Sequence, residues 1–262
     1  MWNTVRAMAD PLVLTEDRGM VRVITLNRPD AMNSINLALS EALADAMDAL
    51  DADDGIRVGV LTGAGRGFSA GMDLKAFVAG EMPMIEGRGL AGMVERGPRK
   101  PLIAAVEGFA LAGGLEVVLG CDLVVAAVNA KLGIPEVTVG LFAGAGALGR
   151  LQRHLPESMA MKMALTGEPI TGEEAHRHGL VVEITERGGA VDAAVALGER
   201  IAKNAPLGVA ASKRIIRESW GLTDAEYWPF QNPIMSDVFA TEDATEGATA
   251  FAEKREPNWR GR

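Results

Sequence analysis

The stretch Ala110-Leu-Ala-Gly-Gly-Leu-Glu116-Val-Val-Leu-Gly-Cys-Asp122 places a carboxylate inside a glycine-rich, apolar run. A second carboxylate, Glu136, lies in a similar setting in Gly133-Ile-Pro-Glu136-Val-Thr-Val-Gly140. Charged side chains are rarely buried without a partner or a task. Two carboxylates in neighbouring apolar settings can separate their pKa values and share acid and base work around one water molecule. Spacing alone leaves open the alternative that both are ordinary solvated or capping residues.

The residues around Glu116 predict a strand, a helix and a second strand. Apolar residues at 102–106 and 123–128 are typical of buried strands, and residues 113–120 between them predict a helix. Strands recur in pairs along this part of the chain, so the order differs from one-to-one βαβ alternation. The other clear elements are a hairpin over 12–15 and 21–26, a helix over 36–50 and a strand over 58–61.

Two later segments have a different character. Residues 80–100 are rich in Gly, Met, Pro and Arg without a clear period, so we expect a mobile segment there. Strands end near residue 204, and three helices are predicted over 206–220, 223–237 and 244–255. Four aromatic residues gather in these helices, where helix packing is the favoured interpretation and a subunit interface the alternative: Trp220, Tyr227, Trp228 and Phe230.

Composition excludes several classes of protein. The 262 residues are enough for one large domain or a body with an appendage. A net charge of −9 without a Lys/Arg run argues against nucleic acid as a partner. The single cysteine, Cys121, excludes a disulfide framework and is expected to be a small buried hydrophobe. Residues 1–10 lack the apolar core of a secretion signal, and the apolar stretch 110–128 contains two acids, so we expect a cytoplasmic protein without a membrane span.

The loop Gly63-Ala-Gly-Arg-Gly-Phe-Ser-Ala-Gly-Met-Asp-Leu-Lys75 is rich in small residues that let the backbone approach a ligand closely. A backbone N–H in such a loop can donate a hydrogen bond to a developing oxyanion. The start of the helix near Gly113 can supply a second donor with a favourable dipole. Two N–H donors and two carboxylates together suit enolate chemistry on an activated acyl group.

These features resemble the crotonase family, the enoyl-CoA hydratase/isomerase superfamily. Each matching motif is weak alone, but together they run in family order across nearly the whole chain. The motifs are Leu26-Asn-Arg-Pro29 with Ala31-Met-Asn33, Phe68-Ser-Ala-Gly-Met-Asp-Leu74, Ala112-Gly-Gly-Leu-Glu116 with Cys121-Asp122, Pro135-Glu136 with Gly140 and Gly144-Ala-Gly146, Leu165-Thr-Gly167 with Ala175 and Gly179-Leu180, and Phe251-Ala-Glu-Lys-Arg255.

The resemblance implies an α/β fold, the crotonase-like spiral of repeated ββα units. It divides the chain into a catalytic body over residues 1–203 and a C-terminal helical segment over 204–262. That segment is expected to assemble the chain into a homotrimer, or into a hexamer made of two trimers.

The resemblance also implies roles for individual residues. The N–H groups of Met72 and Gly113 match the oxyanion hole for the thioester carbonyl. Glu116 and Glu136 match the two hydratase carboxylates, of which the first activates the attacking oxygen and the second transfers the proton to the α carbon. Further substrate contacts are expected from Arg28, Ala31, Met32, Ala70, Asp73, Leu74, Lys75, Gly144 and Lys254.

The implied activity is that of an enoyl-CoA hydratase, which adds water reversibly to a trans-2-enoyl-CoA through an enolate. Both glutamates are present, which favours hydration because many relatives with other activities lack one of them. The alternatives are a carnitinyl-CoA dehydratase-like or enoyl-CoA isomerase reaction and, less favoured, a non-enzymatic RNA-binding role. The expected ligand is an acyl-CoA thioester, with no metal and no cofactor besides the CoA of the substrate.

Some features depart from this pattern or imitate another. Asp30 stands where the family often has a basic residue near CoA phosphate, and Met235 where some members place an aromatic residue. Residues 144–149 spell GxGxxG, but a weak preceding strand and Pro156 argue against a dinucleotide site. Acyl-chain length stays open, although residues 80–100 are expected to shape the acyl pocket.

Overall fold

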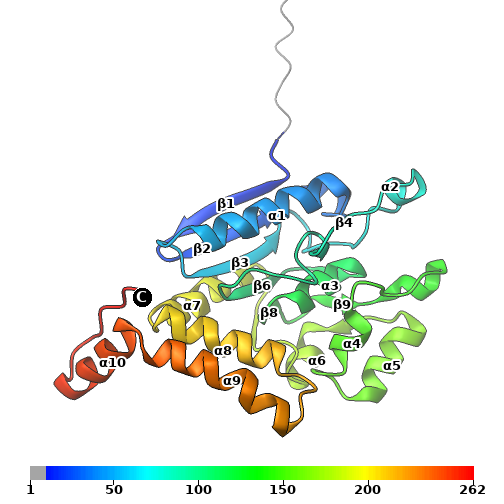
Figure 1. Ribbon diagram of the computed structural model, residues 1–262. Coiled ribbons are helices and arrows are strands. Elements are labelled where there is room, and N and C mark those ends of the chain that lie inside the picture. The colour runs from blue at the N-terminus through cyan, green and yellow to red at the C-terminus, as the bar shows by residue number, and fades with distance from the viewer. Residues whose placement is uncertain (1–9) are drawn as a thin grey trace, which may run out of the picture.

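A computed structural model describes residues 10–262 (Figure 1). The expectation about a secretion signal rests mostly on residues 1–9 and lies outside the described residues. The main sheet has six strands in the order β1-β2-β3-β6-β8-β11. The hairpin β1–β2 is antiparallel and the other pairs are parallel. The strands are β1 (Val13–Arg18), β2 (Val21–Leu26), β3 (Val58–Gly63), β6 (Leu102–Val106), β8 (Leu123–Ala127) and β11 (Glu183–Thr185).

A second sheet of three strands lies beside the main one. It has the order β10-β9-β7, formed by β7 (Phe109–Leu111), β9 (Lys131–Gly133) and β10 (Ile170–Thr171). Strands β6 and β8 each enter the main sheet, and the strands that follow them, β7 and β9, enter the second sheet. Each repeat therefore adds one strand to each sheet. This is the spiral of ββα units that the resemblance implied, and the fold prediction is confirmed.

Helices cover both faces of the main sheet, which explains why its central strands are apolar throughout. The helix α7 (Ala190–Ala202) packs small residues against one face, and a β-carbon on its Gly198 would lie 3.1 Å from Val21. The larger core lies on the other face, under α1 (Leu37–Ala52) and α3 (Gly113–Gly120). Helix α1 begins where the Asn36 side chain accepts the Leu39 N–H at 3.0 Å. Cys121 is buried, as predicted.

The segment 80–100 corrects one expectation. It contains a short hairpin, β4 (Met84–Ile85) and β5 (Gly89–Leu90), and it buries Met93 and Val94 in the core. Several of its glycines, including Gly89 and Gly92, adopt positive φ angles. These turns break any helical or strand period, so the sequence pattern suggested a mobile segment where the structure has a packed one.

The remaining elements of the body are short. They are the 3₁₀ turns η1 (Pro29–Ala31) and η2 (Pro135–Val139) and the helices α2 (Leu74–Val78), α4 (Ala147–Leu151), α5 (Glu157–Thr166) and α6 (Gly172–Arg177).

Three helices follow the body, as predicted: α8 (Pro206–Glu218), α9 (Asp224–Phe239) and α10 (Glu242–Glu253). In Figure 1, α8 and α9 run side by side below α7, and α10 projects beyond them at the opposite end of the molecule from α2. The division into units at residue 204 stays a prediction. Among residues 10–262, none of the helices combines the length and the apolar character needed to cross a bilayer.

Asn33 joins the turn after β2 to the glycine-rich loop after β3. Its buried side-chain nitrogen donates to the carbonyls of Ala64 at 2.8 Å and Gly67 at 3.0 Å, and its side-chain oxygen accepts the Arg28 N–H at 2.9 Å. The φ angle of +52° is one that asparagine tolerates better than most residues. This one amide therefore holds the loop that leads to Met72.

We expect Asn33→Ala to lower the free energy of unfolding by about 2–4 kcal/mol, because it leaves buried backbone groups without partners. Asn27→Ala is the matched control. Its side chain makes a single exposed hydrogen bond, to the Pro11 carbonyl, so its effect should stay below about 1 kcal/mol. Urea unfolding of both variants measures the difference, and equal losses would contradict the assigned role of Asn33.

Candidate active site

One cavity brings together most of the residues that the sequence singled out. It has a volume of about 400 Å³ and lies between α2, the start of α3, η2 and the loop before α4. Seven of the predicted site residues line it: Ala70, Met72, Leu74, Gly113, Glu116, Glu136 and Gly144. Both carboxylates and both proposed oxyanion donors therefore belong to one space.

The backbone at Met72 is oriented by a bridge to Ile35. The Ile35 N–H donates to the Gly71 carbonyl at 2.8 Å, and the Ile35 carbonyl accepts the Asp73 N–H at 2.9 Å. As in any parallel bridge, Ile35 forms its two hydrogen bonds with the residues before and after its partner, here Gly71 and Asp73, and not with Met72 itself. The Met72 N–H therefore faces the other way, and within the described residues it donates to no backbone carbonyl.

Gly113 is the first residue of α3, so its N–H has no acceptor inside the helix. A β-carbon on Gly113 would lie 3.4 Å from the Met72 nitrogen and 2.9 Å from a Leu90 methyl group. A β-carbon on Gly71 would lie 2.8 Å from the Gly113 nitrogen. The two N–H groups thus lie close together in a space that side chains would fill. The positive end of the α3 dipole adds to their attraction for a developing anion.

Ala112 turns the chain sharply from β7 into α3. Its angles, φ +52° and ψ −129°, belong to a region that residues with a side chain rarely occupy. Two hydrogen bonds hold the turn: the Ala112 N–H donates to the Gly133 carbonyl at 2.9 Å, and the Leu111 N–H donates to the Ser69 carbonyl at 3.0 Å. The strained peptide therefore presents the Gly113 N–H in a fixed direction.

Glu116 follows Gly113 by one turn of α3 and is only 3% exposed. Its Oε1 accepts backbone N–H groups from Ala145 at 2.7 Å and Ala147 at 3.2 Å, at the start of α4. Burial raises the pKa of Glu116, and the two N–H donors together with the Arg150 guanidinium offset part of that rise. The carboxylate is thus fixed by one oxygen and perturbed toward the protonated form.

Arg150 ties α4 to the core behind Glu116. Its Nη2 donates to the Val94 carbonyl at 2.5 Å, while its Nη1 is buried without a hydrogen-bond partner among the described residues. Burial lowers the pKa of Arg150. Because Ala145 and Ala147 belong to the same turn, this anchor also positions the two donors of Glu116.

Glu136 lies in η2, and within the described residues its Oε2 is buried without a hydrogen-bond partner. Burial raises the pKa of Glu136, and the neighbouring Glu116 charge raises it further. The negative charge on Glu116 therefore adds to the effect of burial in keeping Glu136 protonated. One can hold a proton while the other is ionised, which is the arrangement that combined acid and base catalysis needs.

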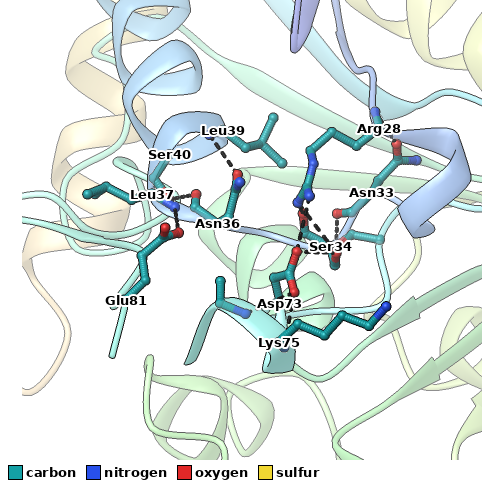
Figure 2. Close-up of polar contacts among 12 residues, drawn as sticks. Arg28, Asn33, Ser34, Asn36, Leu37, Leu39, Ser40, Asp73, Lys75 and Glu81 are labelled. Atoms are coloured by element: carbon teal, nitrogen blue, oxygen red, sulfur yellow. Dashed lines mark hydrogen bonds and ion pairs between the residues drawn. The ribbon is translucent and has the colours of Figure 1, made fainter. Parts of the chain in front are cut away.

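The α2 wall of the cavity is held at both ends by acids (Figure 2). Asp73 pairs with Arg28 at 3.1 Å and accepts the N–H of Lys75 at 3.1 Å, while Glu81 accepts the Leu37 N–H at 2.7 Å. Arg28 also donates to the Ser34 carbonyl. Arg28 and Asp73, expected as substrate contacts, are thus already paired with each other and contribute to the scaffold of the wall.

The other predicted contacts are placed less centrally. Ala31 and the exposed Met32 lie in and after η1, where the Met32 carbonyl accepts the Ala70 N–H at 3.0 Å. Lys75 is exposed on α2 outside the cavity lining. Lys254 ends α10, which in Figure 1 lies far from α2, so a single chain does not bring it to the site.

Sequence reasoning missed the donors of Glu116. Ala145 and Ala147 belong to the GxGxxG-like run 144–149, where the sequence predicted a family motif and a substrate contact at Gly144 but no donor to a carboxylate. The signal that could have found them is a glycine-rich turn entering a helix, which exposes N–H groups for any nearby anion. Here the anion is the chain's own buried carboxylate.

Comparison with known proteins gives consistent matches. Residues 16–262 match the family described as Enoyl-CoA hydratase/isomerase. The chain is 40% identical to enoyl-CoA hydratase EchA19 of Mycobacterium tuberculosis, over 96% of this chain and 97% of that protein. It is 37% identical to 2,3-dehydroadipyl-CoA hydratase of Escherichia coli, over 97% and 100%. The crystal structure of enoyl-CoA hydratase EchA1 from Mycobacterium marinum superposes with a TM-score of 0.94 at 56% identity, covering 97% and 100%.

The raised pKa of Glu136 predicts how stability depends on pH. The folded state binds this proton more tightly than the unfolded state does. That contribution is fully present below the unfolded pKa, near 4.5, and is lost as pH rises through the folded pKa. Glu136→Gln removes the ionisation. The free energy of unfolding of Glu136→Gln minus that of the parent should therefore increase from about pH 4 to pH 8. The increase should be about 1.4 kcal/mol for each unit by which folding raises the pKa of Glu136.

Glu174→Gln is a control of opposite sign. The Thr171 N–H and hydroxyl lower the pKa of Glu174, so that variant should lose relative stability as pH rises. Denaturant unfolding at both pH values measures the two trends. The same trend in both variants would contradict the proposed environment of Glu136.

Proposed function

The chain belongs to the enoyl-CoA hydratase/isomerase family, and we propose that it adds water reversibly to a trans-2-enoyl-CoA to give a 3-hydroxyacyl-CoA. The observation that carries this proposal is the convergence of two backbone N–H donors and two carboxylates on one apolar cavity. The donors suit a thioester oxygen that gains negative charge. The carboxylates suit a water molecule that must lose one proton while the substrate gains another.

The proposed reaction begins with polarisation of the thioester. The carbonyl oxygen accepts hydrogen bonds from the N–H groups of Met72 and Gly113, at the start of α3. Electron density moves toward this oxygen as the enolate forms, and the fixed donors stabilise that charge without rearranging. The low polarity of the surrounding cavity strengthens the interaction.

Glu116 and Glu136 share the proton transfers. Ionised Glu116 removes a proton from water while the water oxygen forms a bond to the β carbon of the substrate. The π electrons of the carbon–carbon double bond then move into the enolate. Protonated Glu136 then gives its proton to the α carbon, and the enolate returns to a thioester. Glu116 ends protonated and Glu136 ionised, so one proton must pass from Glu116 to Glu136 before the next turnover.

This proposed chemistry uses only protein groups, water and the thioester, and it needs no metal or redox cofactor. CoA enters as part of the substrate. A cytoplasmic location stays a prediction.

Glu116→Gln and Glu136→Gln test the mechanism, because each keeps the shape of the side chain and removes its titration. We expect each to lower kcat by roughly two to four orders of magnitude on an enoyl-CoA. The double variant should lose much less than the product of the two effects, since both acids handle one water. Glu157→Gln, an exposed residue at the start of α5, is the control and should keep near-full activity. Loss of the conjugated enoyl absorbance measures turnover.

The outcomes separate hydration from its alternatives. Near-full activity of Glu116→Gln alone would point to isomerase-type chemistry run by Glu136. Activity in both variants would contradict the two-acid mechanism. Absence of hydration on any enoyl-CoA, with isomerase or carnitinyl-CoA dehydratase-like turnover instead, would overturn the proposed reaction.

The proposed assembly is a trimer, or a pair of trimers, formed through α8, α9 and α10. Support comes from large apolar side chains that these helices and the turn between α8 and α9 expose: Ile216, Trp220, Trp228, Met235, Phe239 and Phe251. Phe251 is 88% exposed and Phe239 73%, which is unusual for phenylalanine on a free surface. Assembly would also allow Lys254, remote from the site of its own chain, to approach the site of another chain.

Phe239→Glu should dissociate the proposed trimer, because it places a charge in an apolar interface. Val78→Glu is the control, since Val78 is 85% exposed on α2, far from these helices in Figure 1. Sedimentation velocity at micromolar concentration should show trimers or hexamers for the parent and for Val78→Glu, and smaller species for Phe239→Glu. A stable parent monomer would contradict the proposal.

A further inference from the structure

The acyl side of the cavity is lined by hydrocarbon. One wall carries Leu74 and Phe77 from α2 with Met82, Met84 and Leu90 from the hairpin segment that follows. Another part of the lining is formed by Val139 at the end of η2 with Leu141 and Phe142 from the loop before α4. Among the described residues that line this cavity, the only charged side chains are Glu116 and Glu136. Among the same described lining residues the only hydroxyl is that of Thr138, which already donates to the Pro135 carbonyl at 2.8 Å.

The nearby cations are directed elsewhere. Arg28 pairs with Asp73 and Ser34 behind the α2 wall, and Lys75 is exposed outside the lining. Arg150 contacts the Val94 carbonyl on the far side of Glu116. An acyl group that ends in a carboxylate would therefore lose water without gaining a cationic partner from this chain, and it would meet the negative charge of ionised Glu116.

A cationic acyl group also lacks a suitable partner. Quaternary ammonium groups are recognised by clustered aromatic faces, most effectively those of Trp and Tyr. The described residues that line the cavity include two phenylalanines, Phe77 and Phe142, but no tryptophan or tyrosine. The three methionines of the lining, Met72, Met82 and Met84, are flexible and apolar. They favour hydrocarbon chains of varied shape over a fixed polar end group.

We propose that the physiological acyl group is an uncharged hydrocarbon chain and that this cavity discriminates against acyl groups carrying a distal carboxylate or a quaternary ammonium. This inference rests on the proposed hydratase function and adds its substrate class. It separates this chain in specificity from the dehydroadipyl-CoA hydratase that it resembles in sequence.

A matched pair of substrates tests the proposal. Trans-2-hexenoyl-CoA and 2,3-dehydroadipyl-CoA have the same six-carbon enoyl chain and differ by the distal carboxylate. We expect kcat/KM for hexenoyl-CoA to exceed that for dehydroadipyl-CoA by about 100-fold or more, since an unpaired carboxylate costs several kcal/mol to bury. Equal values, or a preference for dehydroadipyl-CoA, would overturn the inference. Absence of turnover on both and on every other enoyl-CoA would instead overturn the proposed function.

A charge-insertion variant tests the cause. Met82→Arg places a cation in the lining at a half-exposed position that can accept a larger side chain. It should reduce the preference for hexenoyl-CoA by about tenfold or more, mainly through faster turnover of dehydroadipyl-CoA. Val78→Arg adds the same charge on α2 outside the lining and should change the ratio less than about twofold. An unchanged ratio in Met82→Arg, or equal changes in both variants, would contradict the explanation.

Discrimination against a quaternary ammonium is tested by dehydration, the reverse of the proposed reaction. Carnitinyl-CoA and 3-hydroxybutyryl-CoA have the same four-carbon chain and differ by the trimethylammonium group. We expect 3-hydroxybutyryl-CoA to be dehydrated at least about tenfold more efficiently. A preference for carnitinyl-CoA would overturn the inference and favour the dehydratase alternative.

Discussion

The turn at Ala112 is the constraint on which the rest of the site depends. A residue with a side chain occupies a backbone conformation that costs on the order of 1–3 kcal/mol. Hydrogen bonds to Ser69 and Gly133, from two different neighbouring segments, hold it there. The same turn ends β7, begins α3 and presents the Gly113 N–H. Relaxing it would move the donor and the helix that carries Glu116 together.

The second sheet also explains how two distant acids meet. Strands β7 and β9 are parallel, with Leu111 opposite Gly133. The chain leaves β7 into α3 and reaches Glu116, and it leaves β9 into η2 and reaches Glu136. One strand register therefore fixes both carboxylates against the same cavity. Pairing of the two strands thus holds both carboxyl groups in buried positions, and burial raises the pKa of each.

Local patterns predicted much of this architecture. The helix over 113–120 and the strand over 102–106 were predicted with the bounds that the structure has, because apolar runs bounded by glycine, proline or a charged residue leave few alternatives. The two carboxylates stood out because their neighbours are apolar. The sequence could not show that Arg28 is paired with Asp73, since that contact joins residues 45 positions apart. It also could not show that residues 80–100 pack into the core, because their turns erase the period.

The oxyanion donors have an unusual relation to mutation. Both are backbone N–H groups, so among single substitutions at these positions only proline deletes one, and most exchanges elsewhere in the cavity leave them in place. Access to these donors is lost when a substitution adds side-chain atoms beside them. At Gly71, for example, a β-carbon would crowd the Gly113 nitrogen. Scans that remove side-chain atoms would therefore identify the acids and overlook the hole, except where alanine replaces glycine. A descendant of this chain could exchange its acids for other groups and acquire a different reaction while still activating thioesters.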